Sequence, residues 1–210
     1  IWGRSVEDYA VAADALAKHA PAGTASDPIV AVETNLSCPN LAGKKMFAHD
    51  VGAAADVITA TAGLAYPRWA KLSPNTDALV AVAEACAGAG ADAVTLTNTL
   101  LGLVIDTDSR RPALGGGGGG VSGPGLGPIA VRAVWEVARA MPELPIVGVG
   151  GVHDANSALQ LLMAGASAVQ VGTANFADPR ATIRVLDELA SWCDSHGVAT
   201  IAELIGAAHP

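Results

Sequence analysis

The sequence Asn35-Leu36-Ser37-Cys38-Pro39-Asn40 lies at the end of the apolar run Ile29-Val30-Ala31-Val32 and indicates the fold class. Four apolar residues, three of them β-branched, predict a strand buried on both faces, the pattern of a parallel sheet covered by helices. Two carboxamides, a hydroxyl and a thiol then follow within six residues, and Pro39 ends the strand because it lacks a backbone donor. Polar groups around one cysteine at the carboxyl end of a buried strand are what an α/β fold offers a ligand.

The composition limits the class of protein. The chain has 210 residues, 51% of them hydrophobic, and a mean hydropathy of +0.39, which suits one large domain with a sizeable core. No run approaches the roughly 18 unbroken apolar residues of a membrane helix. A net charge of −8 argues against nucleic acid and anionic membranes as partners.

Three cysteines at wide spacing favour a reducing compartment over a disulfide framework or a zinc site. The five histidines also have no mutual spacing typical of a metal site, and we interpret them as surface or capping residues. Cys86 and Cys193 are interpreted as small hydrophobic side chains. We therefore expect a cytoplasmic protein without a metal centre.

Strand-then-helix units repeat along the chain, which predicts an α/β fold. The patterns predict strands at 29–38, 66–72, 93–96, 145–147 and 168–171, and helices at 6–19, 51–62, 76–86, 129–140, 155–163, 180–195 and 201–205. Residues 100–128 are predicted to form a long loop. The predicted N-caps are Ser5 for the first helix, Asp50 for the second, and either Asn75 or Thr76 for the third. Five units fit either an open, doubly wound sheet or the carboxyl part of a (β/α)₈ barrel whose first strands are absent.

Polar or glycine residues follow each predicted strand. The carboxyl ends of parallel strands share one side of a fold, so we expect these groups to face one ligand. The two glycine-rich ends come last, where backbone N–H groups can approach a phosphate closely. This layout suits a phosphorylated, planar cofactor such as flavin mononucleotide (FMN). The residues are Asn35, Cys38, Lys71, Asn98, Thr99, Gly150, Gly151, Gly172 and Thr173.

Six motifs resemble the dihydroorotate dehydrogenase family, in its order and at its spacing. They are Asn-Leu-Ser-Cys-Pro-Asn (35–40), Lys-Leu-Ser-Pro-Asn (71–75), Thr-Asn-Thr-Leu-Leu-Gly (97–102), Gly-Gly-Val-Ser-Gly-Pro (119–124), Gly-Val-Gly-Gly (148–151) and Gly-Ala-Ser-Ala-Val-Gln-Val-Gly-Thr-Ala-Asn-Phe (165–176). The cysteine, the Asn-Thr pair and the run Gly-Thr-Ala-Asn-Phe-Ala-Asp-Pro (172–179) most resemble the class 1B catalytic subunit.

The resemblance implies a TIM (β/α)₈ barrel of the FMN-linked oxidoreductase type. Residues 1–210 would form a single partial domain comprising about strands 4–8, with the first three strands missing. It also implies oxidation of (S)-dihydroorotate to orotate in pyrimidine (UMP) biosynthesis. Because a lysine and a substrate loop of the family belong to the missing part, we expect little activity from this chain alone.

The resemblance also assigns roles to residues. Cys38 would be the general base that takes the C5 proton of dihydroorotate while a hydride leaves C6 for N5 of FMN. Lys71 would stabilise the negative charge that develops at the N1–O2 edge of the flavin. Substrate would be bound by Asn35, Asn98 and Thr99. FMN would be bound by Asn35, Lys71, Thr97, Gly123, Gly150, Gly151, Gly172 and Thr173.

Class 1B implies NAD⁺ as the final acceptor, reached through a partner subunit that carries FAD and a [2Fe–2S] cluster, in a heterotetramer. Three alternatives stay open: the fumarate-linked class 1A enzyme, a flavin barrel like that of dihydropyrimidine dehydrogenase, and a fragment that binds flavin without catalysis. Acceptor assays distinguish the enzymes from one another, and flavin content distinguishes them from an inert scaffold.

Overall fold

The structure is a computed structural model that describes residues 1–20, 29–37 and 46–210. Five parallel strands form the main sheet, in the order β1-β2-β3-β8-β9. Each strand lies beside the one that precedes it in the chain, so the sheet winds in one direction. A doubly wound sheet reverses its direction, and that alternative is therefore wrong. The strands are β1 (Val32–Asn35), β2 (Arg68–Lys71), β3 (Ala93–Leu96), β8 (Ile146–Val149) and β9 (Ala168–Gln170).

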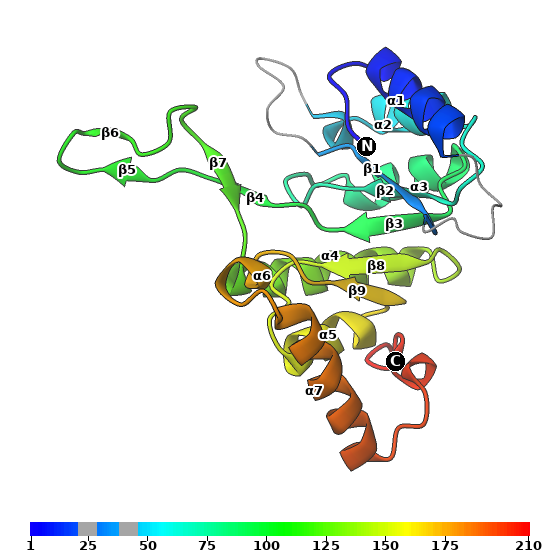
Figure 1. Cartoon of the computed structure of the whole chain (residues 1–210), viewed down its shortest axis with the longest axis vertical. Helices are drawn as coiled ribbons and strands as arrows, with labels where there is room; N and C mark the ends of the chain where they lie inside the picture. Colours follow the sequence, from blue (N-terminus) through cyan, green and yellow to red (C-terminus); the bar gives the residue numbers. More distant parts are fainter. Residues whose placement is uncertain (21–28, 38–45) are drawn as a thin grey trace.

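The helices follow the predicted alternation with these strands (Figure 1). The Ser5 and Asp50 side chains accept hydrogen bonds from the first turns of α1 and α2, which confirms both predicted caps. The α-helices are α1 (Val6–His19), α2 (Val51–Ala60), α3 (Leu79–Gly88), α4 (Gly127–Ala140), α5 (Ala155–Met163), α6 (Ala174–Ala177) and α7 (Ala181–His196). Three short 3₁₀-helices are η1 (Phe47–His49), η2 (Pro124–Leu126) and η3 (Ile201–Leu204).

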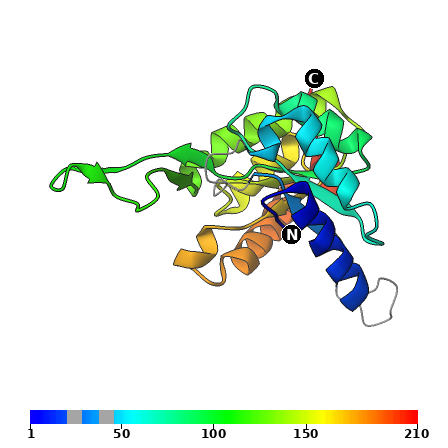
Figure 2. The ribbon, with the colours of Figure 1, turned by 90° about the horizontal axis from the view of Figure 1, so that it is seen from above.

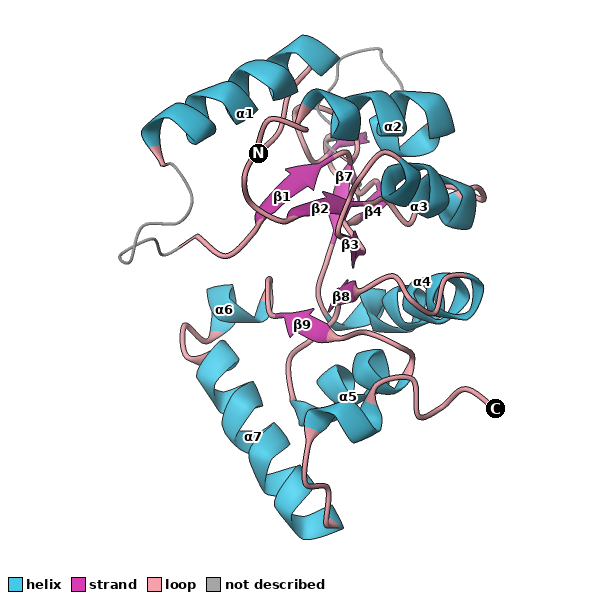
Figure 3. Ribbon diagram, turned by 90° about the vertical axis from the view of Figure 1, so that its right-hand side faces the viewer, coloured by secondary structure: helices cyan, strands magenta, loops and turns pink. Residues whose placement is uncertain are grey.

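The two faces of the sheet differ in character. Helices α2, α3 and α4 lie along one face (Figure 3), where Ala70, Val94 and Ile146 join the main hydrophobic core. On the strands, side chains alternate between faces, so Glu33 and Lys71 point to the opposite face. Both of these side chains are only partly buried, at 26% and 20% exposure. One face of the sheet is thus a helix-covered core, and the other is polar and partly open.

The first strand begins later than its apolar pattern predicts. Residues 29–31 are not in a strand and Val30 is 79% exposed, so the predicted start of the strand at Ile29 and its burial on both faces there are wrong. Pairing instead starts at Val32, whose N–H donates to the carbonyl of Pro67, and continues through Glu33 and Asn35. Tertiary pairing overrides the local hydrophobic pattern here.

The predicted loop at 100–128 is a projecting arm of antiparallel ribbon (Figures 1 and 2). Glycines of the run at 115–120 allow the close pairing of β4 and β7, because a Cβ at Gly120 would collide with the Thr99 side chain. The strands of the arm are β4 (Leu100–Gly102), β5 (Ile105–Asp106), β6 (Arg111–Pro112) and β7 (Gly119–Val121).

The predicted cap of α3 is also wrong. The helix begins at Leu79, and its preceding residue Ala78 makes no side-chain cap. The Asn75 side chain instead donates to the carbonyl of Thr99 (2.9 Å) and accepts from the N–H of Leu101 (2.8 Å). Asn75 therefore ties the loop after β2 to the base of the arm.

None of the helices in the described ranges combines the length and apolar character needed to cross a membrane.

Cys86 and Cys193 differ in burial. Cys86 is fully buried in the main core, and burial raises the pKa of its thiol to about 12. Cys193 on α7 is only partly buried. The interpretation of Cys86 as a core residue is confirmed.

We expect iodoacetamide at pH 8 to alkylate Cys193 and to leave Cys86 unmodified in the native chain. The Cys86 thiol is shielded and stays protonated at this pH, whereas only a thiolate reacts. Peptide mass spectrometry reads both sites, and alkylation in denaturant is the control. Equal labelling of the two cysteines in the native chain would contradict this packing.

Candidate active site

A cavity of about 630 Å³ opens at the carboxyl ends of β2, β3, β8 and β9. This volume lies in the range of small-molecule and cofactor sites. The predicted site residues that line it are Lys71, Thr97, Asn98, Thr99, Gly123, Gly150, Gly151, Gly172 and Thr173. Asn35 lies directly beside this set, while Cys38 and the neighbouring Asn40 fall outside the described residues. The chain thus gathers residues from five separate segments around one space.

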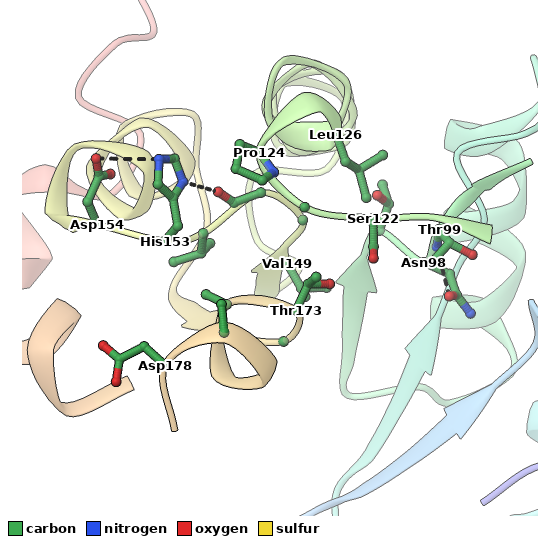
Figure 4. A pocket seen from close by; sticks show the side chains of 18 of the residues that line it. Asn98, Thr99, Ser122, Pro124, Leu126, Val149, His153, Asp154, Thr173 and Asp178 are labelled. Carbon is green, nitrogen blue, oxygen red and sulfur yellow. Dashed lines mark hydrogen bonds and ion pairs between the residues drawn. The ribbon is translucent and has the colours of Figure 1, made fainter. Parts of the chain in front are cut away.

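Two carboxamides are hydrogen-bonded to each other at one end of the cavity. Asn98 Nδ2 donates to Asn35 Oδ1 at 3.1 Å. Asn98 Oδ1 accepts from the N–H of Thr99 at 2.8 Å (Figure 4). Asn35 Oδ1 also accepts from the N–H of Ser37 at 3.1 Å, and the Ser37 hydroxyl donates to the carbonyl of Lys71 at 3.0 Å. These bonds fix the amide orientations and hold the chain at 35–37 against the end of β2.

A carboxylate lies beside the cavity on the open face of the sheet. Glu33 Oε1 accepts from Lys71 Nζ at 3.1 Å. Glu33 Oε2 accepts from Thr95 Oγ1 at 2.8 Å and from Gln170 Nε2 at 3.0 Å. Burial tends to raise the pKa of Glu33, but the Lys71 charge and the hydrogen bonds from Gln170, Thr95 and Lys71 outweigh it and lower that pKa below its ordinary value.

The sequence reasoning missed this Glu33 network. The available signal was a charged residue inside a strand of a predicted parallel sheet, where charge is rare unless it is paired. The strand predicted to end at Cys38 includes Glu33, but this signal was not used.

The opposite end of the cavity is built from glycine-rich turns. Gly150 and Gly151 have φ angles of +128° and +79°, and a Cβ on Gly151 would lie 2.6 Å from the Cα of Gly127. A Cβ on Gly172 would meet no atom within 4 Å. Within the described part of the chain, the N–H groups of Gly150, Gly151, Gly172 and Thr173 donate no hydrogen bond. Unpartnered backbone N–H groups lining a cavity form a site suited to an anion.

Charged side chains beside these turns were not foreseen from the sequence. Arg184 lines the cavity and is held by Asp178 (3.2 Å) and Glu188 (3.1 Å), while it also donates to the carbonyl of His153 (3.0 Å). His153 lines the cavity too, and its Nδ1 lies 2.7 Å from the carbonyl of Gly151 (Figure 4). Two carboxylates neutralise the Arg184 guanidinium, so backbone N–H groups carry most of the attraction for an anion at this end.

One polar atom in the cavity wall lacks a partner. Thr97 Oγ1 is buried and makes no hydrogen bond within the described residues. Buried hydroxyls almost always have a partner, so this atom marks a place where a ligand group can bind. No group of three or more metal-ligating side chains occurs in the ranges that the structure describes.

The comparison with known proteins identifies the family. A model of the family described as dihydroorotate dehydrogenase matches residues 1–192. The chain belongs to the dihydroorotate dehydrogenase family. This confirms the resemblance carried by the six sequence motifs.

Several curated relatives are named dihydroorotate dehydrogenase B (NAD(+)), catalytic subunit. The protein from Trichlorobacter lovleyi is 43% identical over 98% of this chain and 66% of its own length. Those from Pelobacter propionicus and Geobacter sulfurreducens are 45% and 44% identical, over 85% and 98% of this chain and 59% and 66% of their own lengths. The chain thus spans about two thirds of the length of the dihydroorotate dehydrogenase relatives that it matches.

Alanine substitutions at Gly151 and Gly172 compare a position where a Cβ would clash with one where it would meet open space. We expect Gly151→Ala to lower the free energy of unfolding by about 1–3 kcal/mol, because alanine disfavours its positive φ and the new Cβ meets Gly127. The matched control Gly172→Ala should change it by less than about 0.5 kcal/mol, since its Cβ meets open space. Chemical denaturation measures both, and equal effects would contradict the described turns.

Proposed function

We propose that the chain is the larger part of a catalytic subunit that oxidises (S)-dihydroorotate to orotate in pyrimidine biosynthesis. The observation that carries the proposal is the single cavity that brings Lys71 and the Asn98-Thr99 pair to face the glycine turns at 150–151 and 172–173. Family membership and the names of the relatives support the same reaction.

We further propose that residues 1–210 form one partial TIM (β/α)₈ barrel domain. In a flat sheet, strands β1 and β9 would lie roughly 19 Å apart, at about 4.8 Å for each of four spacings. Glu33 on β1 and Gln170 on β9 are nevertheless joined by a 3.0 Å hydrogen bond. Only a strongly curved sheet allows this contact between its two edges. The curvature and the one-directional strand order are those of a barrel arc.

FMN fits the residues that line the cavity. The free N–H groups of Gly150, Gly151, Gly172 and Thr173, with Gly123 nearby, would hold its phosphate. Thr97, whose hydroxyl has no hydrogen-bond partner among the residues that the structure describes, would contact the flavin together with Asn35. Lys71 would lie at the N1–O2 edge of the ring. FMN bound here would supply the acceptor for the hydride of the substrate.

The residues of the chain would orient the substrate and move its proton. Asn98, Asn35 and Thr99 present amide and hydroxyl groups to a ring with carbonyl, N–H and carboxylate groups. The Cys38 thiolate would take the C5 proton on its sulfur as the C5–C6 double bond forms and the hydride leaves C6.

A partner subunit completes the proposal. The words "catalytic subunit" and "NAD(+)" in the relatives' names support a second subunit and NAD⁺ as final acceptor. We assign FAD and a [2Fe–2S] cluster to that subunit, and a heterotetramer to the assembly. In this arrangement the chain itself carries only FMN.

We expect Cys38→Ala, in the chain extended to the length of its relatives, to slow flavin reduction by dihydroorotate by about 10²–10⁴-fold, the usual contribution of a general base. Anaerobic stopped-flow absorbance measures this half-reaction without the partner subunit. The matched control Cys193→Ala, at a partly buried position on α7, should reduce at the wild-type rate. Unchanged reduction in Cys38→Ala would remove Cys38 from the mechanism.

A further inference from the structure

We propose that Glu33 is a positioning residue that holds Lys71 in place and keeps the reduction potential of the bound flavin low. This inference rests on the proposed function, because it concerns Lys71 at the flavin site. Glu33 does not itself line the cavity; it would act through the ammonium group that does.

The geometry of the carboxylate is fixed from three strands. Thr95 on β3 and Gln170 on β9 both donate to Oε2, at 2.8 Å and 3.0 Å, which stops the carboxylate from rotating. Oε1 therefore stays directed at Lys71 Nζ on β2, 3.1 Å away. Lysine has a flexible four-carbon stem and loses much rotamer freedom when fixed, so an anchored partner is what keeps its ammonium at one place.

The pair is shielded enough from water for its charges to act at a distance. The side chains of Lys71 and Glu33 are 20% and 26% exposed, so their interaction is stronger than that of a surface ion pair. The lowered pKa of Glu33 keeps its carboxylate charged at neutral pH. The Glu33 carboxylate, which does not line the cavity, therefore largely balances the positive charge that Lys71 presents to the cavity.

The partial neutralisation of Lys71 by Glu33 would lower the reduction potential of the flavin. A full, unbalanced positive charge beside the N1–O2 edge would stabilise the reduced flavin strongly and raise its reduction potential. The Glu33 carboxylate offsets that charge. A lower potential favours transfer of electrons onward from the flavin, which suits a subunit that must pass them to an acceptor.

The test compares Glu33→Gln with Gln170→Met in the FMN-loaded chain extended to the length of its relatives. Glu33→Gln keeps the shape of the side chain but removes its charge. Gln170→Met removes one hydrogen bond to the same carboxylate and keeps the Glu33–Lys71 charge pair. Dye-equilibrium titration measures the flavin midpoint potential in each variant, and chemical denaturation measures the loss of stability.

We expect Glu33→Gln to shift the equilibrium toward reduced flavin by at least tenfold, which is about 30 mV for a two-electron couple. Gln170→Met should leave the potential near that of the wild type while lowering stability. If Glu33 only ties strands together, the two variants will lose stability without a rise in potential, and the inference is wrong. A fall in potential in Glu33→Gln would also overturn it.

A second measurement reads the ion pair itself without flavin. Carbon NMR titration of the Glu33 carboxyl should give a pKa below the ordinary value, and Lys71→Met should raise it. An unchanged value in Lys71→Met would overturn the inference. Absence of bound flavin in the wild-type extended chain would instead refute the proposed function, while bound flavin with an unaltered potential in Glu33→Gln refutes only this inference.

Discussion

The Glu33 carboxylate accepts hydrogen bonds from side chains on three other strands of the main sheet. It joins β1 to β2 through Lys71, to β3 through Thr95 and to β9 through Gln170. These bonds link the first and last strands of a five-stranded sheet across its open face, and so require the sheet to curve. Curvature turns the carboxyl ends of the strands toward one another, which gathers the cavity residues around a common space.

One face of the sheet provides the hydrophobic core, and the other carries the polar side chains of the site. The helix-covered face buries aliphatic residues such as Val94, Leu96 and Ile146 and provides most of the stabilisation by burial. The open face carries polar side chains whose hydrogen bonds are satisfied mainly by one another. Removal of one member there leaves a partner without its bond, and an unsatisfied buried group costs about 1–3 kcal/mol. The positions of the site side chains therefore depend on all hydrogen bonds of this polar network being made.

Local patterns were sufficient to predict much of the fold. The strand 93–96 and the helices 6–19 and 155–163 were predicted with the bounds observed, because each has a clear hydrophobic period and a cap or glycine end. The predicted start of the first strand at Ile29 was wrong because pairing with β2 begins only at Val32. The arm at 100–121 was missed because its strands, of two or three residues each, are too short to show a hydrophobic alternation.

Some residues of the site were predictable from the sequence and others were not. The glycine turns and the Asn98-Thr99 pair follow predicted strands directly, so topology alone brought them together. Arg184 and His153 reach the cavity from a helix and a loop, through contacts that no local pattern encodes. The Glu33–Gln170 contact joins residues 137 positions apart and follows only from the curvature of the whole sheet. The role of Cys38 rests on family resemblance, since that residue lies outside the described ranges.

The proposed function requires this cavity to hold FMN and to bring dihydroorotate to it. The most direct measurement is the absorbance spectrum of the purified chain, extended to the length of its relatives, before and after anaerobic addition of dihydroorotate. We expect one bound flavin per chain, whose absorbance bleaches on addition of substrate. A purified extended chain that is folded yet neither retains nor takes up flavin would contradict it.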